Sequence, residues 1–87
     1  MSLASRLYKI CDNNNLTIAT AESCTSGLIS STICSVSGAS SFFKGGLIAY
    51  QDQVKINQLN ISKSLIEKKT SVSLEVAKKM AENSLDI

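Results

Sequence analysis

The spacing of apolar positions changes several times along the first third of the chain. An interval of i, i+4, i+7 and i+8 predicts an amphipathic helix, whose apolar stripe consists of Leu3, Leu7, Ile10 and Cys11. Three consecutive asparagines at 13–15 are expected to end it, since asparagine tolerates the left-handed conformation of a helix end. The β-branched, apolar run 16–21 then predicts a short buried strand. Helical spacing resumes over 27–34, with Thr25 or Ser26 expected as the cap.

A turn-rich connection and a second strand are predicted in the middle of the chain. Residues 35–46 are rich in serine and glycine, and Gly45 and Gly46 permit backbone conformations closed to other residues. The apolar run 47–50 that follows predicts a strand ending at Tyr50.

Three short helices are predicted for the rest of the chain. Asp52 is expected to cap the first of them, which carries Lys55. Ser64 and Glu67 have the spacing of a capping box in the second helix. Ser73 is expected to cap the third, whose buried face consists of Val76, Ala77, Met80 and Ala81.

This order of elements predicts an α/β fold with crossover connections between its strands. Nothing in the sequence marks a second domain, so residues 1–87 are expected to form one unit with two strands and three to five helices. A sheet needs about three strands to be stable by itself, and the pattern therefore predicts part of a larger, truncated domain. Its open sheet edges favour self-association by strand pairing or swapping, so a homo-oligomer is expected.

Composition and charge exclude several classes of protein. The chain is 44% hydrophobic and 18% charged, which is typical of a soluble globular domain. A net charge of +2 from scattered lysines is too weak to indicate nucleic-acid binding. No apolar run approaches the roughly 18 residues that a membrane span needs, and the N-terminus lacks the apolar core of a signal peptide. We therefore expect a cytoplasmic protein without a membrane partner.

The cysteines do not have the pattern of a metal site. Cys11, Cys24 and Cys34 are odd in number, lack C-x-x-C spacing and have no histidine to join them, because the sequence contains none. No metal is expected, and Cys11 and Cys34 are interpreted as small core residues. The position of Cys24 among polar neighbours leaves its role open.

Reactive side chains follow both predicted strands. Glu22, Ser23 and Cys24 come after the first strand, Tyr50 ends the second, and Lys55 follows shortly afterwards. Parallel neighbouring strands would bring them to one sheet edge, where ligands of open α/β sheets gather. Without histidine, a serine nucleophile needs another base, and a desolvated lysine can serve, with a tyrosine relaying or orienting the proton.

A plainer interpretation of the same residues stays open. Ser23 is then a turn residue, Tyr50 a half-buried strand end and Lys55 a surface cation. The helix that begins near Thr25 directs its N-terminal amides toward this edge, where they suit a phosphate or a developing oxyanion. The sequence does not decide whether a ligand phosphate would lie there or near Ser40 and Ser41.

Three motifs carry a family resemblance. TAESCTSG at 20–27, G-G-x-x-x-Y-x-x-x-x-K at 45–55 and SVSLEVAKKMAE at 71–82 closely resemble the CinA C-terminal domain family, with a gapless match over about 16–82. These competence/damage-inducible bacterial proteins include the nicotinamide-nucleotide amidases, whose domains are nearly twice as long as this chain. The resemblance therefore implies the N-terminal half of an α/β/α layered, CinA-like domain.

The resemblance also implies an activity and a set of site residues. The activity is cofactor-independent hydrolysis of the carboxamide of nicotinamide mononucleotide, giving nicotinate mononucleotide and ammonia in pyridine-nucleotide salvage. By alignment, the implied catalytic residues are Ser23, Tyr50 and Lys55. Lys55, neutral in a dry site, would take the Ser23 proton, and the amides of residues 24–27 would hold the oxyanion. The implied substrate-binding residues are Glu22, Cys24, Thr25, Gly27, Ser40, Ser41, Gly45 and Gly46.

Departures from the family pattern leave alternatives open. Ser26, Asn60 and Thr70 stand where the family commonly has glycine. Cys24 is a rival nucleophile, disfavoured because no histidine is available to stabilise a thiolate. For Glu22, a structural hydrogen-bonding or water-holding role is favoured over that of a general base. The alternative to an amidase is an inactive remnant that binds nucleotide or self-associates.

Overall fold

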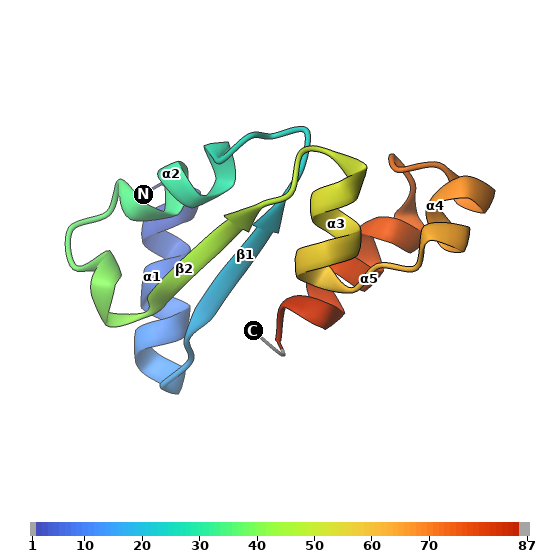
Figure 1. Cartoon of the computed structure of the whole chain (residues 1–87). Helices are drawn as coiled ribbons and strands as arrows, with labels where there is room; N and C mark the ends of the chain where they lie inside the picture. Colours follow the sequence, from blue (N-terminus) through green and yellow to red (C-terminus); the bar gives the residue numbers. More distant parts are fainter. Residues whose placement is uncertain (1, 86–87) are drawn as a thin grey trace.

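The computed structural model describes residues 2–85 as a two-stranded sheet with helices on both faces (Figure 1). In chain order the elements are α1 (Leu3–Asn14), β1 (Ile18–Glu22), α2 (Leu28–Cys34), the 3₁₀ turn η1 (Ala39–Ser41), β2 (Phe43–Ile48), α3 (Asp52–Leu59), α4 (Lys63–Lys69) and α5 (Leu74–Ser84). The predicted α/β class is confirmed. No helix among residues 2–85 has the length and hydropathy that crossing a membrane requires.

The two strands run parallel, as predicted. Their register pairs Ile18 with Phe43 and Glu22 with Ile48, and a β-bulge after the first pair leaves Lys44 without a partner on β1. At the carboxyl end of the sheet the Ala49 amide donates a hydrogen bond of 2.7 Å to the Glu22 carbonyl. The segments that follow β1 and β2 therefore leave the sheet side by side.

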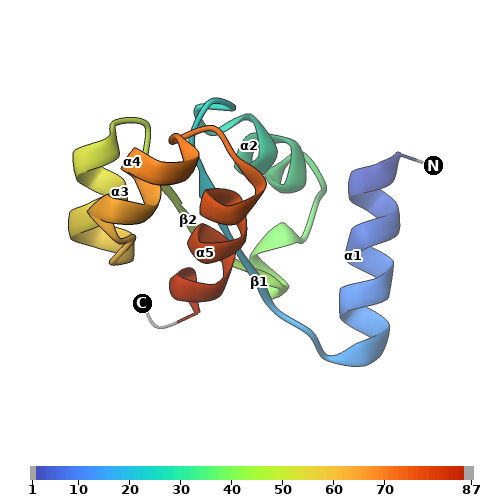
Figure 2. The same ribbon diagram turned by 90° about the vertical axis from the view of Figure 1, so that its right-hand side faces the viewer.

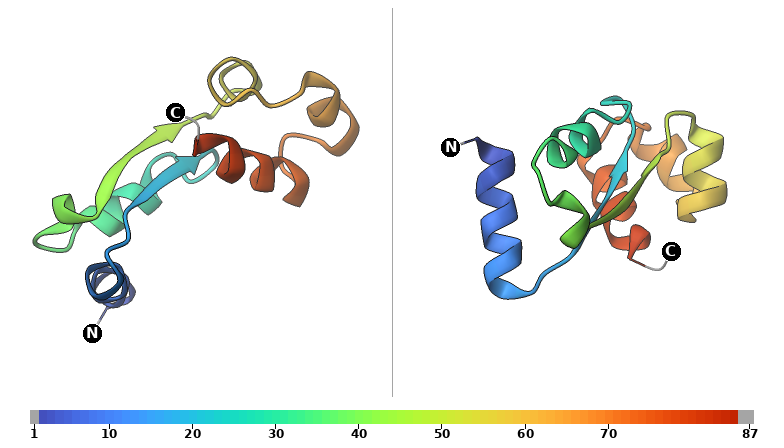
Figure 3. Two further views of the ribbon diagram at one scale, coloured as in Figure 1. Left: turned by 90° about the horizontal axis from the view of Figure 1, so that it is seen from below. Right: turned by 90° about the vertical axis from the view of Figure 1, so that its left-hand side faces the viewer.

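Alternate side chains of β1 face different helical layers. Thr20 faces α2, where its hydroxyl lies 2.7 Å from that of Ser30. Ala21 and Leu47, which are partners across the sheet, pack instead against the core formed with α3, α4 and α5. In Figure 2, α2 lies between the strands and α1, while α5 lies on the other side of the strands. The right-hand view of Figure 3 shows the same order of layers.

Each side of the sheet has its own apolar core. The core beside α5 consists of Ala49, Leu59, Ile61, Ile66, Val76 and Met80. The smaller core beside α2 consists of Cys11, Ile33, Ala39 and Phe42. In the smaller core Tyr8 meets Phe42 edge-to-face, with ring centroids 5.5 Å apart. Burying one large aliphatic side chain contributes about 2 kcal/mol, so the larger core supplies more of the stability.

The second strand begins earlier than predicted. β2 contains Gly45 and Gly46, which the sequence interpretation assigned to a turn, and Tyr50 lies two residues beyond its end. The reason is steric: a Cβ at Gly46 would collide with Thr20 Oγ1 and lie 2.8 Å from Ser30 Oγ. Glycine at this position lets α2 lie close to the sheet, so its role is in packing.

The helix caps were predicted with mixed success. Neither Thr25 nor Ser26 caps α2, whose N-cap position is Gly27 in the left-handed region with φ of 98°. Asp52 is already the first residue of α3, after Gln51.

Ser62, and not Ser64, caps α4 by accepting a hydrogen bond from the Leu65 amide. The predicted end of α1 and start of α5 are confirmed. Asn15 ends α1 with φ of 54°, and Ser73 caps α5, because its Oγ accepts from the Val76 amide at 3.2 Å.

Several predicted core positions lie at the surface. Cys11 is buried as expected, but Cys34 is exposed. In α5, Val76 and Met80 are buried, whereas Ala77 and Ala81 are exposed. In α1, Leu3 and Ile10 are exposed because this outer helix packs mainly against α2.

The three positions at which the family commonly has glycine share one backbone feature. Ser26, Asn60 and Thr70 have φ of 52°, 54° and 70°. Only glycine adopts this region without cost, and a β-branched residue such as Thr70 adopts it least readily. The glycine preference at these sites is therefore a requirement of the backbone.

Candidate active site

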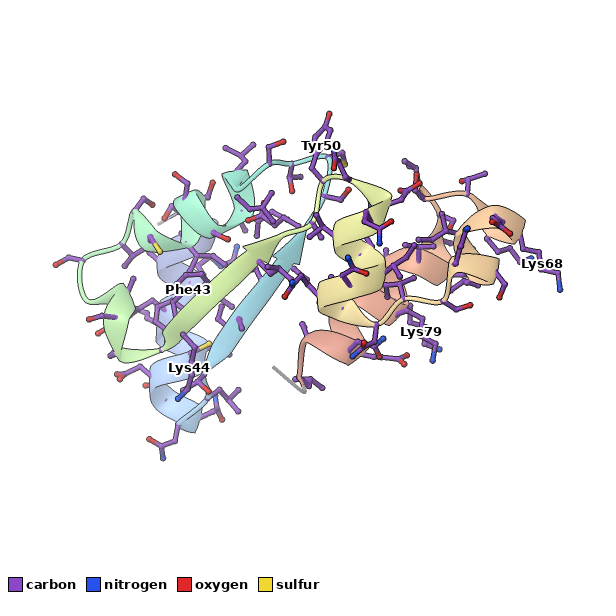
Figure 4. All side chains as sticks on the ribbon, in the orientation of Figure 1. Phe43, Lys44, Tyr50, Lys68 and Lys79 are labelled. Carbon is purple, nitrogen blue, oxygen red and sulfur yellow. The ribbon has the colours of Figure 1, made fainter. Side chains whose placement is uncertain are left out.

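The carboxyl edge of the sheet brings together the two segments that carry the predicted nucleophile and tyrosine. Ser23 directly follows β1, and the Ser26 amide donates to its carbonyl at 3.0 Å, closing a turn. Tyr50 follows β2 at the same edge, is 64% exposed, and projects from the top of the molecule in Figure 4. The half-buried position considered for Tyr50 is therefore wrong.

Lys55 is a buried cation and not the surface residue of the plainer interpretation. Its side chain is 2% exposed and lies at the first turn of α3. The Nζ atom donates to the Tyr50 carbonyl at 3.3 Å and lies 3.6 Å from Asp52 Oδ1, which belongs to a half-exposed side chain. Burial of a charge with so few partners is costly, which makes this lysine a candidate for chemistry.

Glu22 is equally buried but has a full set of hydrogen bonds. One carboxylate oxygen accepts from Thr25 Oγ1 at 2.7 Å and from the Ile29 amide at 2.9 Å. The other accepts from the Ser30 amide at 2.9 Å and from Ser30 Oγ at 2.5 Å. Burial alone would raise the pKa of Glu22, but the hydrogen bonds from Ser30, Thr25 and Ile29 outweigh it and lower the pKa to about 2. Glu22 is therefore an ionised structural group.

The N-terminus of α2 is not an open anion site, because Glu22 occupies it. The Ile29 and Ser30 amides bind the carboxylate, and those of Leu28 and Ser31 donate to backbone carbonyls. Within residues 2–85, the amides of Cys24, Thr25 and Gly27 donate to no other group. These amides, and not those of the helix, are the donors left for a ligand at this edge.

The other predicted binding residues lie in two places. Cys24 is exposed in the turn, the Thr25 hydroxyl is taken up by Glu22, and Gly27 packs beneath Ile48.

Ser40 and Ser41 lie in η1, before β2 begins, and Gly45 and Gly46 lie within that strand. Because β2 has six residues at about 3.3 Å each, roughly 20 Å separates η1 from the carboxyl edge. The structure does not bring Ser40 and Ser41 to Ser23.

A hollow of about 290 Å³ lies elsewhere, near the middle of β2. Its lining includes Lys44, Gly45, Leu47 and Ser84 at the end of α5. It contains none of the three predicted catalytic residues. Among residues 2–85, no three His, Cys, Asp or Glu side chains gather in a way that could hold a metal ion.

Sequence reasoning missed Thr20 and Ser30, which support Glu22. Thr20 and Glu22 are two apart in β1 and therefore share a face, a signal that the sequence does contain. Ser30 joins them only through the packing of α2 on the sheet, which no local pattern reveals.

Comparisons with known proteins place the chain in a family. A family model described as the CinA C-terminal domain matches residues 1–87. A CinA-like protein of Dictyoglomus thermophilum is 47% identical over 81 residues, covering 93% of this chain and 20% of that protein. Two similar crystal structures are of a competence-damaged protein (CinA) superfamily protein from Escherichia coli and a competence or damage-inducible protein from Enterobacter asburiae.

The first is 32% identical with a TM-score of 0.93, covering 97% of this chain and 49% of that chain. The second is 30% identical with the same TM-score of 0.93, covering 97% of this chain and 53% of that chain. The chain thus spans about half the length of the solved relatives and about a fifth of the curated ones. With its motifs, sheet and family match in agreement, the chain belongs to the CinA C-terminal domain family.

Proposed function

We propose that this chain contributes the nucleophile and base of an amidase that hydrolyses the carboxamide of nicotinamide mononucleotide. The observation that carries the proposal is Lys55: a 2%-exposed lysine with one hydrogen bond, to the carbonyl of Tyr50, beside the edge at which Ser23 leaves β1. Its ion pair is with the half-exposed carboxylate of Asp52, whose Oδ1 lies 3.6 Å from Nζ. A buried lysine with so few partners suits proton transfer.

In the proposed reaction, Lys55 Nζ accepts the proton of Ser23 Oγ, with the Tyr50 hydroxyl orienting or relaying it. Ser23 Oγ then forms a bond to the carboxamide carbon, and the carbonyl oxygen becomes an oxyanion. The unbonded amides of Cys24, Thr25 and Gly27 are the available donors, each worth on the order of 3 kcal/mol to the transition state.

Collapse of this intermediate expels ammonia, which takes the proton from Lys55 as it leaves. Water, deprotonated by Lys55, attacks the acyl carbon. The bond from that carbon to Ser23 Oγ then breaks, Lys55 returns the proton to Ser23 Oγ, and nicotinate mononucleotide is released. Ser23 Oγ makes no hydrogen bond within residues 2–85, so substrate binding has to bring the hydroxyl to its base. Such tightening on binding is common at catalytic sites.

The test is ammonia release from nicotinamide mononucleotide by the 87-residue chain. Ser23→Ala and Lys55→Ala should each lower kcat by about 10³-fold or more, because both act on the same proton. Lys63→Ala, at an exposed position in the first turn of α4, is the matched lysine control and should leave kcat unchanged. Absence of turnover in the unmodified chain would refute an amidase for this chain, and equal turnover in all variants would refute the residue assignment.

Cys24 provides a separate check on the nucleophile. Its thiol is exposed and immediately follows Ser23, so Cys24→Ala distinguishes the two candidates. Activity within about twofold of the unmodified chain supports Ser23, whereas loss comparable to that of Ser23→Ala identifies the thiol.

A second candidate function is a non-catalytic module that binds nucleotide or associates with itself. The observation that favours it is the two-stranded sheet, whose outer edges are unpaired within residues 2–85, together with large exposed apolar residues such as Leu28, Val72 and Leu74. Analytical ultracentrifugation over a range of concentrations, with and without nicotinamide mononucleotide, tests it. A monomer that binds no nucleotide excludes this function.

A further inference from the structure

We infer that Thr25 and Ser30 are positioning residues. By donating hydrogen bonds to the carboxylate of Glu22, they hold the turn at residues 23–26 in its reactive conformation. The inference rests on the proposed function for what the turn does, but the hydrogen bonds to Glu22 are a property of this structure. The side-chain hydroxyls of Thr25 and Ser30 bind Glu22 and are not placed against the reacting atoms, so both side chains act through another residue.

The carboxylate of Glu22 connects two segments of backbone. Its first oxygen accepts from Thr25 Oγ1 at 2.7 Å, and thereby holds the middle of the turn that begins at Ser23. Its second oxygen accepts both the amide and the hydroxyl of Ser30, at 2.9 and 2.5 Å, and thereby holds α2. Because Glu22 is the last residue of β1, the turn is fixed between a strand and a helix.

The direction of these hydrogen bonds follows from the charge on Glu22. An ionised carboxylate only accepts, so the Ser30 hydroxyl must donate its single proton to Glu22. The Ser30 oxygen therefore accepts from Thr20 Oγ1, 2.7 Å away in β1. A chain of donors runs from Thr20 through Ser30 to Glu22, and it fixes both the orientation of Ser30 and the distance of α2 from the sheet.

The turn needs this support because its backbone is unfavourable. Ser26 has φ of 52° and Gly27 has φ of 98°, so two consecutive residues are left-handed. The turn itself contains the hydrogen bond from the Ser26 amide to the Ser23 carbonyl, and Leu28 donates to Thr25. Without the Thr25 side chain, the donors of Cys24, Thr25 and Gly27 would lose their fixed relation to Ser23.

Glu22 cannot be the base in place of Lys55. Its two oxygens already accept four hydrogen bonds, it is buried, and a pKa lowered to about 2 makes it a weak acceptor of a proton. A group so fully occupied holds geometry and does not move protons.

The test compares Thr25→Val with Thr25→Ser in the 87-residue chain. Valine has the shape of threonine without the hydroxyl, and serine restores the hydroxyl. Thr32→Val is the matched control, because Thr32 lies in the following helix α2, is exposed and bonds only the Leu28 carbonyl through its hydroxyl. Ser30→Ala removes the hydroxyl bond to the other carboxylate oxygen and keeps the bond from the Ser30 amide.

Two readouts separate this inference from the amidase proposal. Amide hydrogen exchange measures how firmly Glu22 holds the turn and the start of α2. Thr25→Val and Ser30→Ala should raise the exchange rates of the Ser26 and Ile29 amides about tenfold relative to those of α5. Thr25→Ser and Thr32→Val should leave them within about twofold of the unmodified chain. Unchanged exchange in Thr25→Val overturns the inference, whether or not the chain has amidase activity.

Where ammonia release is measured, Thr25→Val and Ser30→Ala should lower kcat about tenfold with KM changed less than about twofold. The pH at which activity rises should stay the same, because the base is not altered. Restoration of kcat by Thr25→Ser supports positioning by the hydroxyl. A shifted pH profile, or kcat unchanged in Thr25→Val, contradicts it.

Discussion

Glu22 and Lys55 are each only 2% exposed, yet their surroundings are opposite in kind. Glu22 lies on the α2 side of the sheet and accepts four hydrogen bonds, two of them from the first turn of a helix. Lys55 lies at α3, on the other side of the sheet, with one carbonyl at 3.3 Å and one half-exposed carboxylate at 3.6 Å. A buried charge that is fully hydrogen-bonded stabilises a fold, and one that is barely partnered is available for chemistry.

The difference follows from the elements that carry the two charges. A carboxylate at the start of a helix meets amides and the positive end of the helix dipole. A lysine in the first turn of α3 meets that same end, which does not favour its charge, and its neighbours in sequence, Val54 and Ile56, pack into the apolar core. The start of a helix therefore stabilises the charge of Glu22 and does not stabilise that of Lys55.

The largest effect on activity should come from removing the charge of Lys55, which has fewer hydrogen-bond partners than Glu22. Lys55→Met keeps the length of the side chain and should lower kcat for ammonia release by about 10³-fold, because it removes the amine that accepts the Ser23 proton. It should leave the urea midpoint unchanged or raise it, because replacing a buried charge by an apolar group is often neutral or stabilising. A large fall in stability together with the loss of activity would show that Lys55 is structural.

A smaller effect is expected from disturbing the support of Glu22. Gly46→Ala places a methyl group against Thr20 Oγ1 and Ser30 Oγ, so the chain should lose about 2–3 kcal/mol of unfolding free energy. Gly45→Ala is the matched control. Its Cβ would meet nothing within 4 Å, and its cost of about 1 kcal/mol comes from φ of 144° alone. Urea unfolding measures both, and equal losses would contradict the close approach of α2.

Much of this comparison could be predicted from the sequence, for identifiable reasons. The ends of parallel strands meet at one edge, so the neighbourhood of Ser23 and Tyr50 follows from two short apolar runs. The cap of α2 could not be predicted, because the amides of Ile29 and Ser30 bind a carboxylate seven and eight residues earlier in the chain. Thr25 and Ser26 are good local caps, and tertiary structure overrides them.

The start of β2 was missed for the same kind of reason. A pair of glycines ordinarily indicates a turn, and only the hydroxyls of Thr20 and Ser30 explain why Gly46 is needed inside a strand. Both errors concern contacts between segments distant in sequence, and both concern Glu22 or its supports.

The pH dependence of stability tests how much the hydrogen bonds to the ionised Glu22 stabilise the fold. The pKa of Glu22 is lowered from 4.5 to about 2, so its hydrogen bonds contribute fully above pH 4.5 and are lost as pH falls toward 2. The urea midpoint of the unmodified chain should therefore fall between pH 4.5 and 2. Glu22→Gln should be less stable at pH 7 and should show a weaker decline over this window. An equally steep decline in Glu22→Gln would assign the effect to other carboxylates.

The smallest effects concern the backbone that Glu22 holds in place. Ser26→Gly should raise the unfolding free energy by about 0.5–1 kcal/mol, because glycine adopts φ of 52° without cost. Thr70→Gly, at φ of 70°, should raise it by about 1 kcal/mol, since a β-branched residue adopts this region least readily. Of these two positions, only Ser26 lies in the turn that Thr25 and Glu22 fix. In a Thr25→Val background the gains in unfolding free energy from Ser26→Gly and Thr70→Gly should therefore differ. Ser26→Gly should then stabilise less, because a released turn no longer imposes the left-handed conformation, while Thr70→Gly keeps its full effect. Equal behaviour of the two substitutions in both backgrounds would mean that the turn keeps its shape without Glu22.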